Sequence, residues 1–429
     1  MPTPEPTTAQ PKISQKMILR TAILLFVLAI MFVGYRYVES QHGDFNFGDA
    51  NSSGLISAIQ TKDNGQEAVI IHPDGAITGT AAWKDGVSDR DVVWQPDGRF
   101  LYFVSDRTGN TYHLYRWNPA QDSADQMTGG TRGRSAPSFP ADDATDAADY
   151  MLMICGGVIQ GFDPKRKITP QILPKPTANI TQSTDVEESG SEGEFQALYG
   201  KIGTAFRSAR YIKGNRFIVA VIERDNGEVL IAQEVEPKDG KPHPFSIIAG
   251  GHIDYDVNPK DGSVVFTVQN FQFPDPDHVP TEFIKNNKVT RPVNHAIGMF
   301  DPDNPGLVMI GRRMDDKVAF GAPAISPDGA SVLLTEGPYD PTTQSMQSQQ
   351  MISCPIKQQG LQMNSTVVRG EVYEPSWSPD GSKIVFVMRN HGKRDIYTMS
   401  SDGSSQTDLT SGKGDFSFPR FSPQVKADK

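Results

Sequence analysis

The stretch Trp377-Ser-Pro-Asp-Gly381 (WSPDG) has near-copies at 94–98 (WQPDG) and at 325–329 (ISPDG). Proline presets φ near −65° at the first corner of a β-turn, aspartate accepts hydrogen bonds from nearby amides, and glycine tolerates positive φ. An alternating, β-rich run follows the turn, as in KIVFVM at 383–388. We therefore predict a recurring hairpin with a structural turn motif. Its residues are Trp94, Pro96, Asp97, Gly98, Pro327, Asp328, Gly329, Trp377, Pro379, Asp380 and Gly381.

The hairpin belongs to a larger repeat of four short strands. Residues 374–410 run as an aromatic-ended strand, the turn, SKIVFVM, DIYTMS and a short strand that ends in Leu-Thr, and residues 91–128 follow the same order. Four-stranded repeats at this spacing indicate a β-propeller. We expect an all-β propeller of seven four-stranded blades, or six if the degenerate segment 135–173 is not a blade.

The two ends of the repeat region complement each other. Residues 55–61, 67–73 and 76–80 read as the second, third and fourth strands of a blade that lacks its first strand. Residues 416–423 (FSFPRFSP) read as a first strand with none after it. Pairing of these N- and C-terminal strands closes the ring and leaves no open sheet edge.

The repeats resemble the TolB-like propeller family, also called WD40-like or PD40, whose pattern is PxWSPDGxxIxFxSxRxGxxxIYxMxxDGxxxxLT. Residues 375–410 match this pattern closely and residues 93–128 match it well. The resemblance implies the fold, whereas the function of such repeats varies. The periplasmic TolB protein has an α/β domain before its propeller, but only residues 39–51 separate the apolar segment from the repeats here. A role in the Tol-Pal system is therefore not implied.

An apolar segment precedes the repeats. Residues 21–35 (TAILLFVLAIMFVGY) carry no charge and lie between Arg20 and Arg36. Neighbouring apolar residues extend the segment to 17–38, close to the ~20 residues that a spanning helix needs. Two lysines ahead of it predict a cytoplasmic N-terminus and a periplasmic or extracellular propeller, with a single pass through the inner membrane. A cleaved signal peptide is the alternative.

The predicted organisation follows from these segments. It consists of a disordered cytoplasmic tail (1–16), a transmembrane anchor (17–38), a linker (39–51), the β-propeller (52–423) and a C-terminal tail (424–429).

Composition and motifs limit the chemistry that we expect. The chain carries 41 Lys+Arg against 51 Asp+Glu, so no basic face predicts a nucleic-acid partner. We find no GxSxG, HExxH, Walker A or GxGxxG motif, and we predict no catalytic residue and no cofactor. Cys155 and Cys354 are expected to be two separate buried thiols. Asp301 and Asp303 form a weak calcium candidate, for which a plain turn is the favoured alternative.

Long loops are the strongest candidates for binding. The connections 174–205, 270–293 and 337–348 are all expected on one face of the ring, and long loops in compact domains are often functional. We predict 270–293 as the main docking element. The candidate contact residues are Phe271, Phe273, His278 and Phe283, with Tyr339 from the neighbouring loop. The alternative is that the phenylalanines pack back onto the blades.

These observations predict a membrane-tethered, extracytoplasmic propeller that binds protein partners in the envelope or in a membrane complex. A hydrolase or lyase acting in the central funnel is one alternative. Binding of a small ligand or carbohydrate without catalysis is another.

Overall fold

The computed structural model describes residues 54–80, 83–119, 123–140, 151–163, 170–173, 198–238, 243–275, 279, 281, 284–285, 288–289, 294–311, 317–357, 360–361 and 366–423. The chain divides into two compact units, Met1–Asn51 and Ser52–Lys429, and all described residues belong to the second. The predicted tails, anchor and linker lie outside the described residues. Within the described ranges, no helix combines the length and the apolar character that crossing a bilayer requires.

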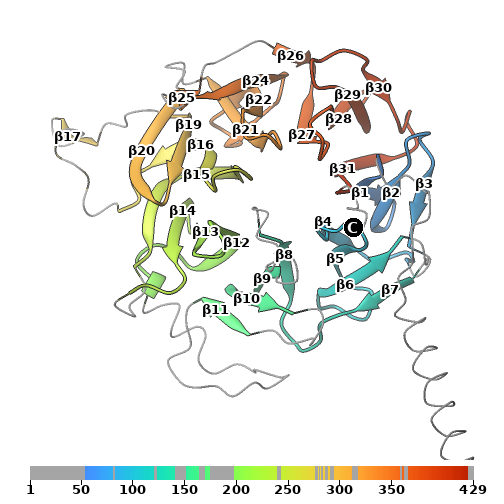
Figure 1. The fold of residues 1–429 in the computed structure, drawn as a ribbon, viewed down its shortest axis with the longest axis horizontal. Helices are drawn as coiled ribbons and strands as arrows, with labels where there is room; N and C mark the ends of the chain where they lie inside the picture. Colours follow the sequence, from blue (N-terminus) through green and yellow to red (C-terminus); the bar gives the residue numbers. More distant parts are fainter. Residues whose placement is uncertain are drawn as a thin grey trace, which may run out of the picture. The chain divides into compact units, whose positions relative to one another are not determined.

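The described strands form antiparallel sheets that surround a central axis (Figure 1). In the first three sheets the strands run, from inside outward, as follows. They are β31 (Asp415–Phe421), β1 (Ile56–Lys62), β2 (Gly65–Ile71) and β3 (Ile77–Gly79); then β4 (Asp89–Trp94), β5 (Leu101–Ser105), β6 (His113–Asn118) and β7 (Ser123–Gln126); then β8 (Arg134–Ser138), β9 (Met151–Cys155), β10 (Val158–Phe162) and β11 (Gln171–Leu173).

The fourth sheet has seven strands, and the fifth and sixth return to the basic pattern. The seven strands are β12 (Ala205–Ile212), β13 (Phe217–Arg224), β14 (Gly227–Glu234), β15 (Phe245–Val257), β16 (Val264–Gln272), β19 (Ala296–Asp301) and β20 (Asn304–Gly311). The fifth sheet contains β21 (Val318–Ile325), β22 (Ser331–Asp340), β24 (Gln350–Lys357) and β26 (Thr366–Arg369), with β23 (Ser345–Met346) and β25 (Gly360–Leu361) at its sides. The sixth contains β27 (Val372–Trp377), β28 (Lys383–Asn390), β29 (Lys393–Ser400) and β30 (Thr407–Asp408).

The all-β propeller is confirmed, and its count depends on β15. Six sheets of the described chain make up the ring, which is the alternative count from the sequence. The seven predicted four-stranded repeats fit into six sheets because β15 is long. Its first part pairs with β14 and its second part pairs with β16, so it ends one repeat and begins the next.

The predicted closure is also confirmed. β1 pairs antiparallel with β31, with Ile56 opposite Phe421, and the Ser422 amide donates to the Leu55 carbonyl at 2.8 Å. Strands from the two ends of the repeat region therefore complete one sheet. This pairing leaves neither strand with a free edge on its inner side.

The core lies between neighbouring sheets. Every residue of β5 is buried, and six consecutive positions of β13 are apolar (FIVAVI), because sheets cover both faces of these middle strands. One cluster joins β1 and β2 to β4, β5 and β6 and includes the fully buried Trp117 and Phe103. Each pair of sheets thus shares its own layer of side chains.

The Pro-Asp-Gly turns have the predicted geometry. Gly98, Gly329 and Gly381 have φ of 73°, 70° and 71°, a region that favours glycine. In the turn at 377–381, the Asp380 carboxylate accepts from the Ser382 amide at 3.0 Å. The indole of Trp377 donates to the Ala324 carbonyl of β21 at 3.0 Å. The aromatic residue before the turn therefore ties its own inner strand to the preceding one.

The inner strands share a β-bulge. Asp91, Ala136, Ala322, Glu374 and Phe418 have positive φ at equivalent places in β4, β8, β21, β27 and β31. The ladder register shifts at these points, and such bulges re-aim side chains.

An acid three residues before the end of one inner strand accepts from the next strand's bulge amide. Asp91 accepts from the Ala136 amide at 3.0 Å, and Asp254 accepts from the Ala322 amide at 3.1 Å. Glu374 accepts from the Phe418 amide. We call these contacts the carboxylate bridges; they join neighbouring inner strands around the central channel.

Candidate functional site

A small hairpin stands within the loop that connects β16 to β19. It consists of β17 (Ile284–Lys285) and β18 (Lys288–Val289), in which Ile284 pairs with Val289. These two side chains are 43% and 54% exposed. Figure 1 shows β17 outside the ring of sheets. Aliphatic side chains displayed in this way are typical of surfaces that contact another molecule.

The phenylalanines predicted as contacts lie at the base of this loop. Phe271 ends up only 8% exposed, and its ring packs edge-on against Phe273 with centroids 5.3 Å apart. Both pack against the apolar cluster between β13 and β16. His278 and Phe283 lie outside the described residues. The two described rings thus hold the loop to the sheet, and a direct contact role for all four stays a prediction.

Polar contacts hold the same loop base. Arg224 at the end of β13 donates to the Phe273 and Pro274 carbonyls, at 3.3 and 2.7 Å. Burial lowers the pKa of Arg224, and the charge of Asp275 opposes this effect. The Gln272 side chain donates to the Asn226 carbonyl at 2.6 Å. The point from which the hairpin projects is therefore well fixed.

The predicted Tyr339 lies beside the loop from the preceding repeat. Its ring centroid is 4.3 Å from that of His295, which is 2% exposed just before β19. The His295 Nδ1 accepts from the Asn270 amide at 3.2 Å. Tyr339 therefore joins the β22–β24 connection to the base of the predicted docking loop. Both connections leave from strand ends next to the starts of inner strands, so they share one face of the ring.

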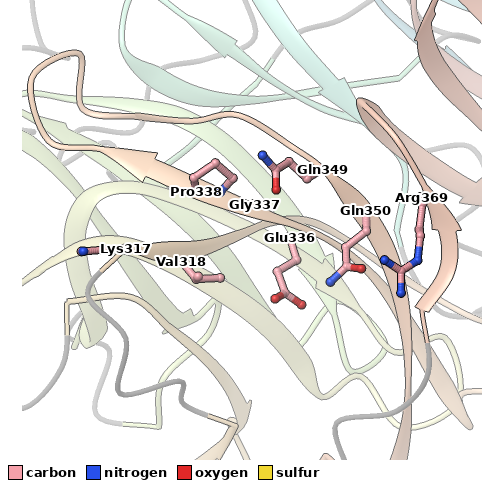
Figure 2. A pocket seen from close by; sticks show the side chains of 8 residues that line it. All are labelled: Lys317, Val318, Glu336, Gly337, Pro338, Gln349, Gln350 and Arg369. Atoms are coloured by element: carbon pink, nitrogen blue, oxygen red, sulfur yellow. The ribbon is translucent and has the colours of Figure 1, made fainter.

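A polar pocket of about 400 Å³ opens at this end of the fifth sheet (Figure 2). Glu336, Gln350 and Arg369 form one cross-strand row on β22, β24 and β26. Glu336 is 3% exposed, and Figure 2 shows Lys317 and Arg369 on opposite sides of it. The lining is completed by Val318, Gly337, Pro338 and Gln349. Charges of both signs with two amides suit a polar peptide segment better than an apolar ligand.

The central channel holds a charged network between β12, β14 and β15. His252 lies 3.4 Å from a Glu228 oxygen and 3.1 Å from an Asp254 oxygen, and Arg207 lies 2.8 Å from Glu228. Hydrogen bonds to Asp254 and Glu228 raise the pKa of His252 to about 10, so the imidazole is protonated at neutral pH. Burial would raise the pKa of Asp254, but the hydrogen bond from His252 lowers it.

A second group of charges faces the same channel from β27 and β31. Burial raises the pKa of Glu374, against the Phe418 amide and the Arg420 charge. Burial lowers the pKa of Arg420 although its side chain is solvent-exposed, and the charges of Glu374 and Asp256 oppose that shift. Exposure combined with a desolvation effect places Arg420 in a narrow, water-filled passage. Opposite charges alternate along this wall.

The calcium candidate is engaged by basic side chains. Lys213 lies 3.0 Å from Asp301 and 3.2 Å from Asp303, and Arg216 also pairs with Asp303. The Asp303 amide donates to the Asp301 carboxylate at 3.1 Å, as in an ordinary turn. Among the residues that the structure describes, no group of three or more His, Cys, Asp or Glu side chains is arranged to hold a metal ion.

The two cysteines are free and buried, as predicted. Cys155 accepts from Arg134 Nη1 at 2.7 Å. Burial raises the pKa of Cys155, and the Arg134 charge opposes that shift. A buried thiol of raised pKa is a poor nucleophile.

The channel acids were missed by motif searching, although the sequence carries a signal for them. Asp91, Asp254 and Glu374 each stand three residues before the residue that ends an inner strand, in DVVW, DYDV and EPSW. An aligned acidic position in a propeller repeat faces the axis. The pocket beside Glu336 has no comparable signal, because its row forms only through cross-strand pairing.

No protein-family model and no curated protein matches the chain. Solved structures of similar fold include TolB from Acinetobacter baumannii, with 12% identity, 87% of this chain and 67% of that chain covered, and a TM-score of 0.47. They also include an oligogalacturonate lyase from Vibrio parahaemolyticus (13% identity, 83% and 84% covered, TM-score 0.48). A third is a puromycin-hydrolyzing peptidase from Mycobacterium tuberculosis (11% identity, 84% and 54% covered, TM-score 0.48). Identities this low concern the fold alone: the chain is a β-propeller similar in fold to TolB and to propeller-containing enzymes.

Proposed function

We propose that this protein is a membrane-tethered, extracytoplasmic propeller that binds a protein partner in the envelope or in a membrane complex. The observation that carries the proposal is the exposed pair Ile284 and Val289 on the β17–β18 hairpin. The tether rests on the apolar segment 17–38 and on the basic residues before it.

The base of the docking loop supports this role because it is held in place. Arg224 binds the carbonyls at the start of the loop, and Phe271 with Phe273 packs into the core. A projecting group on a fixed base loses little conformational entropy when a partner binds. The polar pocket beside Glu336 opens on the same face. An apolar contact with polar groups around it is the usual anatomy of a protein interface.

The test uses a double variant of the hairpin. A photo-crosslinking residue at position 284 is expected to capture a partner in solubilised membranes, and mass spectrometry identifies it. Ile284→Asp with Val289→Asp should then weaken binding of the purified partner by tenfold or more, roughly what loss of one interface hot spot costs. The matched control, Ile284→Val with Val289→Ile, keeps the apolar surface and should bind normally. Undiminished binding by the folded double aspartate variant would overturn the proposal.

Catalysis in the central funnel is a second candidate, favoured by the channel charges around His252, Asp254 and Glu374. A carboxyl group of raised pKa beside a protonated imidazole is a typical acid–base arrangement. The assay is a screen of oligosaccharides and peptides with the purified protein. Any turnover should fall by at least about a hundredfold in Glu374→Gln, as loss of a general acid requires. Turnover that survives this change would remove the funnel from the mechanism.

A further inference from the structure

A second pocket, of about 190 Å³, lies on the opposite side of the ring from the docking loop. It forms where β14 ends, where β15 begins and where β19 ends, so it belongs to the two repeats that share β15. Its lining is Phe217, Ala232, Glu234, Pro237, His243, Phe245, Phe300 and Pro302. The proposed docking function makes no use of it.

Strand pairing explains why this space exists. Phe217 pairs with Glu234, and Ala232 pairs with Phe245, so all four side chains lie on one face of the sheet. That face packs against Phe300 of the next repeat. Ala232 is 3% exposed and small, so it leaves room between the aromatic rings where a larger side chain would fill the gap.

The aromatic walls have an arrangement that leaves one ring open to solvent. The rings of Phe245 and Phe300 stack with centroids 5.6 Å apart and planes 13° apart. Phe300 is 2% exposed, whereas Phe245 is 45% exposed, one of few large apolar side chains of the described chain that solvent reaches. An apolar ring held open in this way is available to a ligand.

The charges around the pocket favour a cation. Glu234 is the acidic residue of the lining. The nearby Lys213 and Arg216 are paired with Asp301 and Asp303, so their charges are compensated. The Arg216 guanidinium lies 4.8 Å from the centroid of Phe217, so this ring already carries a cation against it. Aromatic faces next to a carboxylate are the usual means of binding an organic ammonium group.

We propose that this pocket binds a small quaternary-ammonium compound of the choline type. The methylated ammonium group contacts the faces of Phe217 and Phe245, and Glu234 balances its charge. The rival occupant is a neutral aliphatic group of the same shape, which would use the hydrophobic effect alone.

The experiment is calorimetric titration of the full chain, in a maltoside detergent free of choline, with choline and with its neutral isostere 3,3-dimethyl-1-butanol. Choline should bind roughly tenfold more tightly than the alcohol, as loss of a cation–π pair and a counter-charge implies. Phe245→Leu and Glu234→Gln should each weaken choline binding about fivefold. Ala232→Met, which fills the space, should abolish it.

Phe418→Leu is the matched control, because it removes an equally exposed phenylalanine from an inner strand and should leave binding unchanged. Circular dichroism checks that each variant folds. Equal affinity for choline and the alcohol, no heat with either, or unchanged binding in folded Phe245→Leu would each overturn the proposal.

Discussion

Replacing Asp254 with alanine tests the carboxylate bridges. The Asp254 side chain is 32% exposed and accepts from the Ala322 amide at 3.1 Å and from His252 at 3.1 Å. A hydrogen bond to a charged group contributes about 1.5–3 kcal/mol, and solvent screening at this exposure reduces that figure. Two such contacts therefore predict a loss of about 2–4 kcal/mol for Asp254→Ala.

The expected shift in melting temperature follows from the size of the propeller. An unfolding entropy of about 2.1 cal/mol/K per residue, over roughly 370 residues, amounts to about 0.8 kcal/mol/K. Asp254→Ala should then lower the melting temperature by about 3–5 °C, measured by circular dichroism or differential scanning fluorimetry. Asp254→Asn keeps an acceptor for the Ala322 amide and should lose about half as much.

Asp91→Ala is the matched comparison. Asp91 also bridges to the next inner strand, through the Ala136 amide at 3.0 Å, but its cation Arg90 is 3.9 Å away and both side chains are more exposed. This variant should lose about 0.5–1.5 kcal/mol. A loss in Asp91→Ala that equals or exceeds the loss in Asp254→Ala would refute the reasoning.

Three further predictions concern pH, turns and calcium. Protonated His252, whose pKa is raised to about 10, stabilises the fold fully below about pH 6.5 and loses this effect as pH rises through 10, so melting curves of His252→Gln should vary less with pH in that range. Gly381→Ala, at a φ of 71°, should cost about 1 kcal/mol in urea unfolding, whereas Gly129→Ala, whose φ is not positive, should cost less. Millimolar calcium should leave the melting temperature unchanged, because Lys213 and Arg216 already pair with Asp301 and Asp303; a rise would restore the calcium site.

The repeat and its closure were predictable because they depend on local chemistry. The turn at 377–381 needs proline, aspartate and glycine in fixed order, and the strand after it shows its period directly. The shared strand β15 was not predictable. The sequence FSIIAGGHIDYDV contains two glycines that read as a break, yet the chain pairs with β14 before them and with β16 after them. Continuity of that kind depends on both neighbouring strands.

The candidate sites were less predictable than the fold. Exposed aromatics were the signal that pointed to the loop 270–293, but Phe271 is buried, and the side chains that reach solvent are Ile284 and Val289. The pockets near Glu336 and Phe245 consist of residues far apart in sequence that meet across strands. Residue type and spacing carry no record of such pairings, whereas the acids at 91, 254 and 374 do share a position in the repeat.

The pairing of β1 with β31 has a mechanical consequence for a chain held at its N-terminal side. A pull on residue 55 acts along β1, which is hydrogen-bonded on one side to β2 and on the other to β31. Both ladders would be loaded in shear, so many bonds must break together before the strand moves. Thermal motion of a surrounding lipid layer would therefore swing the disc as a whole without peeling its first strand away.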